Sequence, residues 1–466
     1  MRLSWLLFAG ATLAGCTVGP NYQRPEIGLT PTYASGAIRA GDAHWWTAFG
    51  DPLLDHVVER ALAQNLDIVA AAARVDQARG AAQAAGAALL PTAGATGSAE
   101  QARTSRRTPF GAASEQLGFP RDYALYQVGM QASWEIDLFG GLRRGREAAR
   151  AEFSGSQAEA DAVRLSVAAE TVDAYLQLRG LQARLAVAER QLANERSLVD
   201  LIRQRVAQGI AADREFNRSL GEQRGIEASL APLRAGIARQ VNCLDVLMGT
   251  QAGSGTAELA PVTAIPLAPD PSGSAIPADL LRRRPDVAAA ERRLMAANAR
   301  IGVAIADYYP HLSLGGLLGV ASVGTGGLFT GGAVQASGTA GLRWRLFDFG
   351  RVDAEVVQAR GRQAETLALF RGSVLQATAE VETALTRLAE QRIAVEAFQA
   401  QTAALTAARD QARQAYEGGV IALVEVLDAD HALLEAADRL ENARAEAARA
   451  SVAAIRALGG GWQSGA

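Results

Sequence analysis

Two stretches of the chain alternate apolar and polar residues, and a segment with a different period follows each of them. Alternation with a period of two predicts a β-strand with one apolar and one polar face. The later stretch, residues 333–347, has apolar side chains at Val334, Ala336, Ala340, Leu342, Trp344 and Leu346. The earlier stretch, residues 126–137, has them at Tyr126, Val128, Met130, Ala132, Trp134 and Ile136. We therefore expect an amphipathic strand at each place.

Behind each strand the apolar residues recur every seven positions, which predicts a coiled-coil helix. The recurring residues are Leu178, Leu185, Leu192, Val199 and Val206 after the earlier strand, and Leu367, Val374, Val381, Leu388 and Val395 after the later one. Because no proline interrupts residues 140–208 or 350–416, each segment is expected to form one unbroken helix. Such a helix is roughly 100 Å long at 1.5 Å per residue.

Glycines end both long helices. Gly209 and Gly419 stand where the heptad patterns stop, and glycine is the usual residue just past a helix end. Apolar residues then resume at helical spacing, which predicts return helices over residues 213–248 and 423–458. Pro232 predicts a kink in the first return helix.

The two halves of the chain share one register. The matching positions are Trp134 and Trp344, Leu178 and Leu388, and Gly209 and Gly419, all at a single constant offset. A common register over such a distance indicates an internal duplication. The expected order is a signal peptide (residues 1–15), a tether (16–50), a first repeat (51–250), a linker (251–278), a second repeat (279–458) and a C-terminal tail (459–466).

Two further strands complete the pattern. Weaker alternation predicts strands over residues 92–101 and 311–322, each following a helix that ends at a proline. The segment between the first two strands, up to Asp122, is predicted to be an exposed loop. Aromatic residues near the strand ends fit the two girdles of an outer-membrane strand. They are Tyr123, Tyr126, Trp134 and Trp344.

The N-terminus predicts a lipid anchor. A short basic start and the apolar run at residues 3–13 precede Leu13-Ala14-Gly15-Cys16, which resembles the lipobox of bacterial lipoproteins. That resemblance implies that Cys16 becomes the mature N-terminus and carries acyl chains, palmitate among them. Thr17 after the cysteine favours the outer membrane over the inner one. Since no later apolar run could span a bilayer as a helix, any crossing must use strands.

Composition excludes several other functions. The formal net charge of -3 gives no reason to expect nucleic-acid binding. The four histidines lack metal-ligand spacing, and no phosphate loop or nucleophile motif occurs, so we expect neither a metal site nor an enzyme. Cys16 and Cys243 are the only cysteines, which excludes a disulfide framework. Cys243 is interpreted as a small core residue of the first return helix. No cofactor is expected beyond the lipid on Cys16.

Four amphipathic strands cannot close a barrel, so the chain must associate with copies of itself. Three chains would supply twelve strands around a water-filled lumen. At this point the sequence resembles the TolC-like outer membrane factor family, in its lipoprotein efflux (NodT/OprM-type) branch. The motifs that carry the resemblance are Trp45-Trp46, Asp51-Pro52, Arg283-Arg284-Pro285-Asp286, Ala296-Ala297-Asn298-Ala299, Val426-Leu427-Asp428-Ala429 and Leu458-Gly459-Gly460-Gly461-Trp462.

The resemblance implies a fold and a set of partners. It implies a mixed α/β membrane protein, a homotrimer whose 12-stranded β-barrel (four strands per chain) lies in the outer membrane of a Gram-negative bacterium. A long periplasmic α-helical barrel continues it and docks on a periplasmic adaptor and an inner-membrane RND pump. The implied function is a passive exit duct for drugs or other small toxic compounds. Two alternatives stay open: an exit channel for type I protein secretion, and a periplasmic coiled-coil scaffold lipoprotein without a pore.

The family's periplasmic gate lies at the start of the last return helix. The matching residues here are Glu425 and Asp428, with Tyr416 on the preceding helix. Because Glu425 and Asp428 lie three apart on a helix, both can face a narrowing bore, or they can cap the turn after Gly419. His431 stands where another branch of the family has an arginine, which predicts a pH-sensitive closure.

Overall fold

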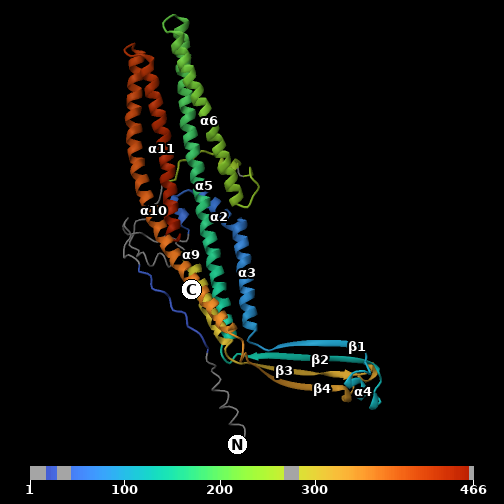
Figure 1. The fold of residues 1–466 in the computed structure, drawn as a ribbon. Coiled ribbons are helices and arrows are strands. Elements are labelled where there is room, and N and C mark those ends of the chain that lie inside the picture. Colours follow the sequence, from blue (N-terminus) through green and yellow to red (C-terminus); the bar gives the residue numbers. More distant parts are fainter. Residues whose placement is uncertain (1–16, 29–43, 255, 267–282, 461–466) are drawn as a thin grey trace. The chain divides into compact units, whose positions relative to one another are not determined.

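A computed structural model describes residues 17–28, 44–254, 256–266 and 283–460 (Figure 1). The chain divides into two compact units. The strand unit comprises Met1–Pro25, Asp76–Gly155 and Glu291–Leu369, and the helix unit comprises Glu26–Val75, Ser156–Ala290 and Phe370–Ala466. Each unit takes segments from both halves of the sequence. The expected repeats are therefore not separate compact bodies.

The strand unit holds one antiparallel sheet. Its strands are β1 (Thr92–Arg103), β2 (Asp122–Ile136), β3 (His311–Ser322) and β4 (Val334–Arg343), hydrogen-bonded in the order β1-β2-β3-β4 (Figure 1). Trp134 lies opposite Leu314, which in turn lies opposite Ala340. Residues directly opposite each other in an antiparallel sheet share a face. The alternation in the sequence therefore produces one apolar and one polar face across all four strands.

The helices repeat in matched lengths. Those of the first half are α2 (Pro52–Gln64), α3 (Leu66–Ala87), α5 (Gly141–Ala207) and α6 (Asp213–Leu247), and those of the second half are α9 (Pro285–Ala306), α10 (Arg351–Glu417) and α11 (Leu423–Ala457). Short pieces are η1 (Trp45–Phe49), α4 (Pro109–Gln116), α7 (Thr256–Leu259), η2 (Thr325–Gly327) and η3 (Gly331–Ala333). The long helices α5 and α10 have 67 residues each, and the return helices α6 and α11 have 35 each. These equal lengths fit the inferred duplication.

The tips of both helical hairpins are built alike. Gly209 has φ 72° and Gly419 has φ 73°, in the left-handed region that favours glycine. The next residue then bonds back into the last helical turn: Ile210 N donates to Arg205 O at 2.9 Å, and Val420 N donates to Ala415 O at 2.9 Å. This pattern satisfies carbonyls at the helix end and reverses the chain.

The main core of the helix unit surrounds the middle of α5. Its fully buried side chains include Leu54, Val57 and Val58 of α2, Val172, Tyr175 and Leu176 of α5, and Leu244 of α6. Asp51 caps α2, since its Oδ1 accepts from Leu53 N at 3.0 Å, and its Oδ2 accepts from the Tyr175 hydroxyl at 2.6 Å. One carboxylate therefore both starts a helix and fixes it to α5.

Strand β4 is shorter than the predicted strand at 333–347. The alternation continues through Trp344 and Leu346, but β4 ends at Arg343, opposite His311. Pro310 precedes His311 and has no backbone N–H, so β3 offers no partner beyond this point. Arg345 instead pairs with Asp307 at 3.3 Å.

The region between β1 and β2 also differs from the prediction. The strands run to Arg103 and from Asp122, beyond the expected 92–101 and 126–137, and an ion pair of 3.5 Å joins these two end residues. At its other end β2 stops at Ile136, because Asp137 accepts hydrogen bonds from the first turn of α5. The predicted loop contains α4, which Thr108 caps through a bond from Gly111 N at 3.2 Å.

The remaining predictions concern Cys243, Pro232 and the two ends of the chain. Cys243 is exposed rather than buried, because it lies off the face of α6 that carries Val241 and Leu244. Helix α6 continues through Pro232. The signal peptide, Cys16, part of the tether and linker, and most of the C-terminal tail lie outside the described residues. Among the helices in the described part of the chain, none is both long and apolar enough to cross a membrane.

Candidate functional site

The polar face of the sheet is a shallow groove. It has a volume of about 500 Å³ and is lined by Thr92, Thr96, Gln131, Ser133, Ser337 and Thr339, together with Leu317 and alanines and glycines. Gly129 and Gly319 face each other across β2 and β3, and a Cβ on Gly319 would lie 2.6 Å from Val128 O. Only glycine allows this close approach. The face can contact water and polar solutes along its whole length.

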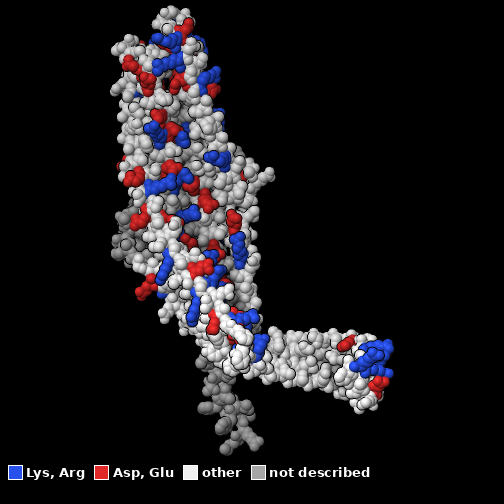
Figure 2. All heavy atoms as spheres, in the orientation of Figure 1, with Lys and Arg blue, Asp and Glu red and all other residues white. Residues whose placement is uncertain are grey.

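The apolar face carries larger side chains, and its charged residues in β1 and β2 are the pair Arg103 and Asp122 at the strand ends. It presents Tyr126, Val128, Met130 and Trp134 of β2, Leu312, Leu314, Leu318 and Val320 of β3, and Val334, Ala336, Ala340 and Leu342 of β4. Met130, Leu318 and Val334 are exposed. Charged residues gather instead where β1 and β2 are joined, and the visible strands are otherwise nearly free of them (Figure 2). Such a face suits a lipid environment.

The four predicted interface aromatics do not share one environment. Tyr126 and Trp134 lie on the apolar face, whereas the register puts Tyr123 on the opposite face, with Gln127. An odd spacing along a strand always separates two residues to opposite faces. Trp344 lies just beyond β4 and is half exposed.

The two tryptophans make the same hydrogen bond. Trp134 Nε1 donates to Leu89 O at 3.0 Å, and Trp344 Nε1 donates to Tyr308 O at 2.9 Å. Each accepting residue stands two positions before the proline that separates a short helix from its strand. The indoles therefore anchor equivalent turns of the two repeats.

At the far ends of the long helices, Tyr416 is a core residue. It is buried in a cluster with Leu198 and Ile202 of α5 and Leu423, Val426 and Leu427 of α11. The guanidinium of Arg205 lies 4.6 Å from the centre of its ring, within cation–π range. Tyr416 therefore ties α10 to α5 instead of standing in an open passage.

The other gate candidates point to α6. Asp428 Oδ1 lies 3.3 Å from Arg218 Nη2, and His431 Nδ1 lies 3.3 Å from Glu222 Oε1. Glu425 is exposed, and no ion pair links it to another described residue. Asp428 and His431 of α11 thus both pair with residues of α6, whereas Glu425, also on α11, does not.

Sequence reasoning missed the partners of these residues. Arg218 lies 210 positions before Asp428, the same offset that relates Gly209 to Gly419. Equivalent positions of the two repeats therefore hold opposite charges and pair with each other. The repeat offset was the signal that could have found Arg218, whereas nothing in the local sequence marks Glu222.

Two buried carboxylates lie behind the tip. Asp430 is 3.5 Å from Arg409 Nη1, and Glu195 accepts a hydrogen bond of 2.6 Å from Ser219 Oγ. Burial raises the pKa of Glu195, and the charges of Asp430 and Glu222 raise it further, although the Ser219 bond opposes them. A carboxylate so placed resists ionisation in the folded protein.

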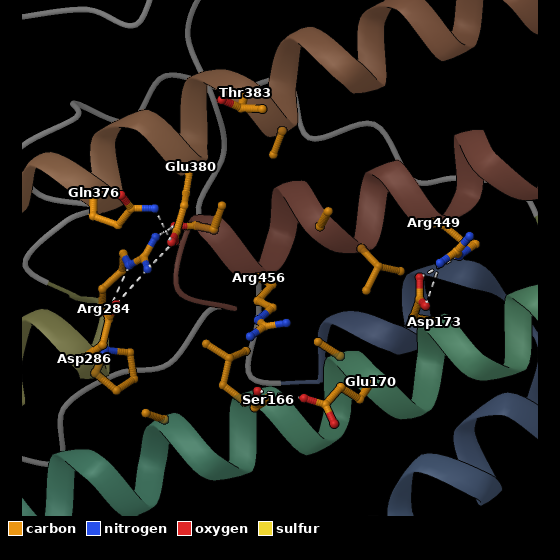
Figure 3. A pocket seen from close by; sticks show the side chains of 18 of the residues that line it. Ser166, Glu170, Asp173, Arg284, Asp286, Gln376, Glu380, Thr383, Arg449 and Arg456 are labelled. Atoms are coloured by element: carbon orange, nitrogen blue, oxygen red, sulfur yellow. Dashed lines mark hydrogen bonds and ion pairs between the residues drawn. The ribbon is translucent and has the colours of Figure 1, made fainter. Parts of the chain in front are cut away.

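A second groove in the helix unit has a volume of about 810 Å³ and lies among α5, α10, α11 and the start of α9 (Figure 3). Arg284 points into it, only 8% exposed, and bonds Asp286 and Glu380 at 2.7 Å each. Burial opposes ionisation of Asp286, but the bond and charge of Arg284 prevail and lower the pKa of Asp286. Arg449 pairs with Asp173 at 2.8 Å in the same groove. Its charges mostly neutralise one another.

Comparison with known proteins identifies the family. A sequence model of the family described as outer membrane efflux protein matches residues 57–250 and 276–460. The chain belongs to this family. It is 33% identical to the pyoverdine export outer membrane protein OpmQ of Pseudomonas putida, over 100% of this chain and 97% of that protein. It is 30% identical to the toluene efflux pump outer membrane protein TtgF of Pseudomonas putida, over 100% and 98%.

A solved structure of a similar protein supports the fold. The outer-membrane channel OprN superposes with a TM-score of 0.87 at 31% identity, over 96% of this chain and 100% of that one. The expected fold class, a TolC-like channel chain with four strands and long helices in two similar halves, is therefore confirmed. The resemblance to the NodT/OprM-type branch is confirmed as well. This outer membrane efflux family is one of channels rather than enzymes.

Proposed function

We propose that the protein is the outer-membrane exit duct of a tripartite RND-type efflux system. It conducts drugs or other small toxic compounds passively, and the pump supplies the energy. The observation that carries this proposal is the sheet with one apolar face and one polar, groove-forming face. Relatives named for pyoverdine export and toluene efflux support it.

The duct is a homotrimer. In the described residues β1 and β4 each pair with one strand only, so both sheet edges are open. Lipid offers no hydrogen bonds to an open edge. Pairing β1 of one chain with β4 of the next closes a ring, and three chains give twelve strands, an even number found in outer-membrane barrels. The polar faces then line the lumen.

A lipid on Cys16 anchors the chain to the outer membrane. Thr17, the residue after Cys16, packs against Gly140 at the junction of β2 and α5, where a Cβ on Gly140 would lie 2.8 Å from Thr17 Cα. This junction is the end of a membrane-crossing strand, so acyl chains on Cys16 would reach the adjacent leaflet. The helices extend into the periplasm toward an adaptor and the pump.

The helix tips form the periplasmic gate. The Asp428–Arg218 and His431–Glu222 pairs hold α11 to α6, and Tyr416 fixes α10 to α5. Partner binding opens the gate by separating α11 from α6. Because His431 attracts Glu222 only when protonated, closure strengthens at acid pH.

Reconstitution in planar bilayers tests the duct. Purified full-length protein should run as a heat-sensitive trimer and conduct ions, and a strain lacking it should become more sensitive to toxic compounds. A non-conducting, soluble periplasmic product would instead indicate a coiled-coil scaffold. Loss of secretion of a large protein in the deletion strain, without a change in drug sensitivity, would indicate a secretion channel.

The gate has its own test. Conductance of the wild type should fall as the pH decreases from about 8 to about 5. The variant His431→Arg keeps its charge and should conduct equally across this range. Identical pH curves for the two proteins would refute a role for His431 in closure.

A further inference from the structure

One arginine cluster of the strand unit takes no part in the functions above. A groove of about 360 Å³ between α5 and α9 is lined by Arg143, Arg146, Glu147, Arg150, Ser154 and Arg292, among others. It contains four guanidinium groups and a single carboxylate. Both helices belong to the strand unit in this part of the chain.

The carboxylates near the groove are already paired. Glu147 Oε2 accepts a bond of 2.7 Å from the buried Arg144, which points away from the groove toward the N-terminal segment. Asp137 Oδ2 lies 3.1 Å from Arg143 Nε and also accepts from Arg143 N at 2.9 Å. Neither acid is therefore available to neutralise the remaining arginines.

Three arginines of the groove lack an acidic partner. Within the described residues no carboxylate oxygen lies in ion-pair range of Arg146, Arg150 or Arg292. Arg146 is half-buried, with its Nε near Gly86 of α3. Arg150 lies one turn further along α5, on the same side of the helix. Arg150 and Arg292 are exposed, so the half-buried Arg146 is the guanidinium whose missing counter-ion is unusual and favours binding of an anion.

The distance of the groove from the end of β2 follows from the position of its arginines in α5. Helix α5 begins at Gly141, directly after β2, so Arg146 and Arg150 lie about 8–14 Å from the strand end at 1.5 Å per residue. The headgroup layer on each side of a bilayer core is about 5–8 Å thick, so with the end of β2 at the core boundary Arg146 lies at the outer edge of this layer and Arg150 lies beyond it. Arg144 on the same turn bonds Val18 O at 3.1 Å and Asn21 Oδ1 at 2.8 Å. These bonds hold residues 17–21 against α5 through Arg144, which does not line the groove.

We propose that this groove binds the phosphate headgroup of an anionic phospholipid of the periplasmic leaflet. The proposal rests on the membrane insertion argued under Proposed function. Guanidinium groups match phosphate oxygens in a bidentate fork, and Ser154 adds a hydroxyl donor. The acyl chains extend along the apolar face of the sheet. The bound lipid fixes the depth of the chain in the membrane alongside the lipid on Cys16.

The test compares two triple variants of the full-length protein. The first, Arg146→Gln/Arg150→Gln/Arg292→Gln, removes the unpaired charges of the groove. The matched control, Arg351→Gln/Arg360→Gln/Arg362→Gln, removes three arginines near the start of α10, the counterpart of α5 in the second repeat. Native mass spectrometry in detergent counts bound phosphatidylglycerol, with phosphatidylcholine and inorganic phosphate as competing probes.

The wild type and the control should retain phosphatidylglycerol, and the groove variant should bind it at least about tenfold more weakly, because its three guanidinium charges are gone. An equal loss in the control would refute the site. Displacement by inorganic phosphate at the same concentration would indicate an adventitious anion site and refute lipid binding. Conductance of the groove variant separates the proposals: normal conductance without lipid binding overturns only this inference.

Discussion

The two repeats make the same backbone contact with different side chains where the short helix meets the return helix. In the first repeat Asn65 Nδ2 donates to Leu247 O at 3.0 Å, and in the second Arg284 Nη1 donates to Ala457 O at 3.0 Å. Asn65 and Arg284 each stand directly before a 22-residue helix, α3 or α9. The first joint is neutral, while the second adds two ion pairs.

The contrast between the joints shows which part of a duplicated structure is constrained. The carbonyl at the end of a return helix needs a donor, because buried backbone groups must be satisfied. An amide and a guanidinium both supply one. The tryptophans follow the same rule, since Trp134 and Trp344 both donate to a turn carbonyl. The repeats therefore keep the backbone bond and vary the charge around it.

Breaking the charged joint should have the largest effect. Arg284→Met removes the donor to Ala457 O and leaves Asp286 and Glu380 without their common partner. We expect the free energy of unfolding to fall by about 3 kcal/mol, which is near the lower limit for breaking a buried ion pair, because both carboxylates are half exposed. Thermal unfolding of the purified protein, followed by far-UV circular dichroism, measures it. Asn65→Leu should cost about half as much.

The pH dependence of this pair follows from its sign. Because the pKa of Asp286 is lowered in the folded protein, its contribution is complete above the ordinary aspartate pKa and is lost as the pH falls through the lowered value. The stability gap between the wild type and Arg284→Met should therefore narrow below about pH 4. The Asn65→Leu gap should not change with pH. Equal losses in both variants would contradict the contrast between the joints.

The tryptophan anchors should behave as equals. Trp134→Phe and Trp344→Phe each remove one indole hydrogen bond and keep an aromatic ring, so each should cost about 1 kcal/mol. The comparison of their unfolding temperatures in the same detergent measures this. A clear difference between the two unfolding temperatures would show that the repeats are not equivalent at this turn. Tyr126→Phe serves as the control, because it removes a hydroxyl that makes no such hydrogen bond within the described residues.

Local signals in the sequence predicted the helices best. Gly209 and Gly419 end their helices because the required backbone conformation is a property of glycine itself. The end of β4 was not predictable from alternation, because it depends on where β3 begins after Pro310. The face of Tyr123 and helix α4 were missed although the sequence held both signals, since Tyr123 lies an odd number of residues from Tyr126, and Thr108 and Pro109 form a standard helix start.

The candidate site was predicted only in part, for the same reason. Tyr416 and Asp428 came from a resemblance, and the residues that hold them lie on other helices. Ion pairs between helices depend on how the helices pack against each other, and the sequence of a single segment does not determine that packing. Arg218 is the exception, since the repeat offset links it to Asp428.

Exchanging the charges at the helix tips should have the smallest effect on stability. Arg218 and Asp428 are exposed, so their pair contributes about 0.2–1 kcal/mol. Arg218→Asp should nevertheless raise the open probability in planar bilayers, because it sets two carboxylates against each other between α6 and α11. The double variant Arg218→Asp/Asp428→Arg restores the attraction and should close again. Each joint bond lies within one repeat and any donor can supply it, whereas the tip pair joins equivalent positions of the two repeats and needs opposite charges. A double variant as open as the single one would show that this pair does not hold the gate.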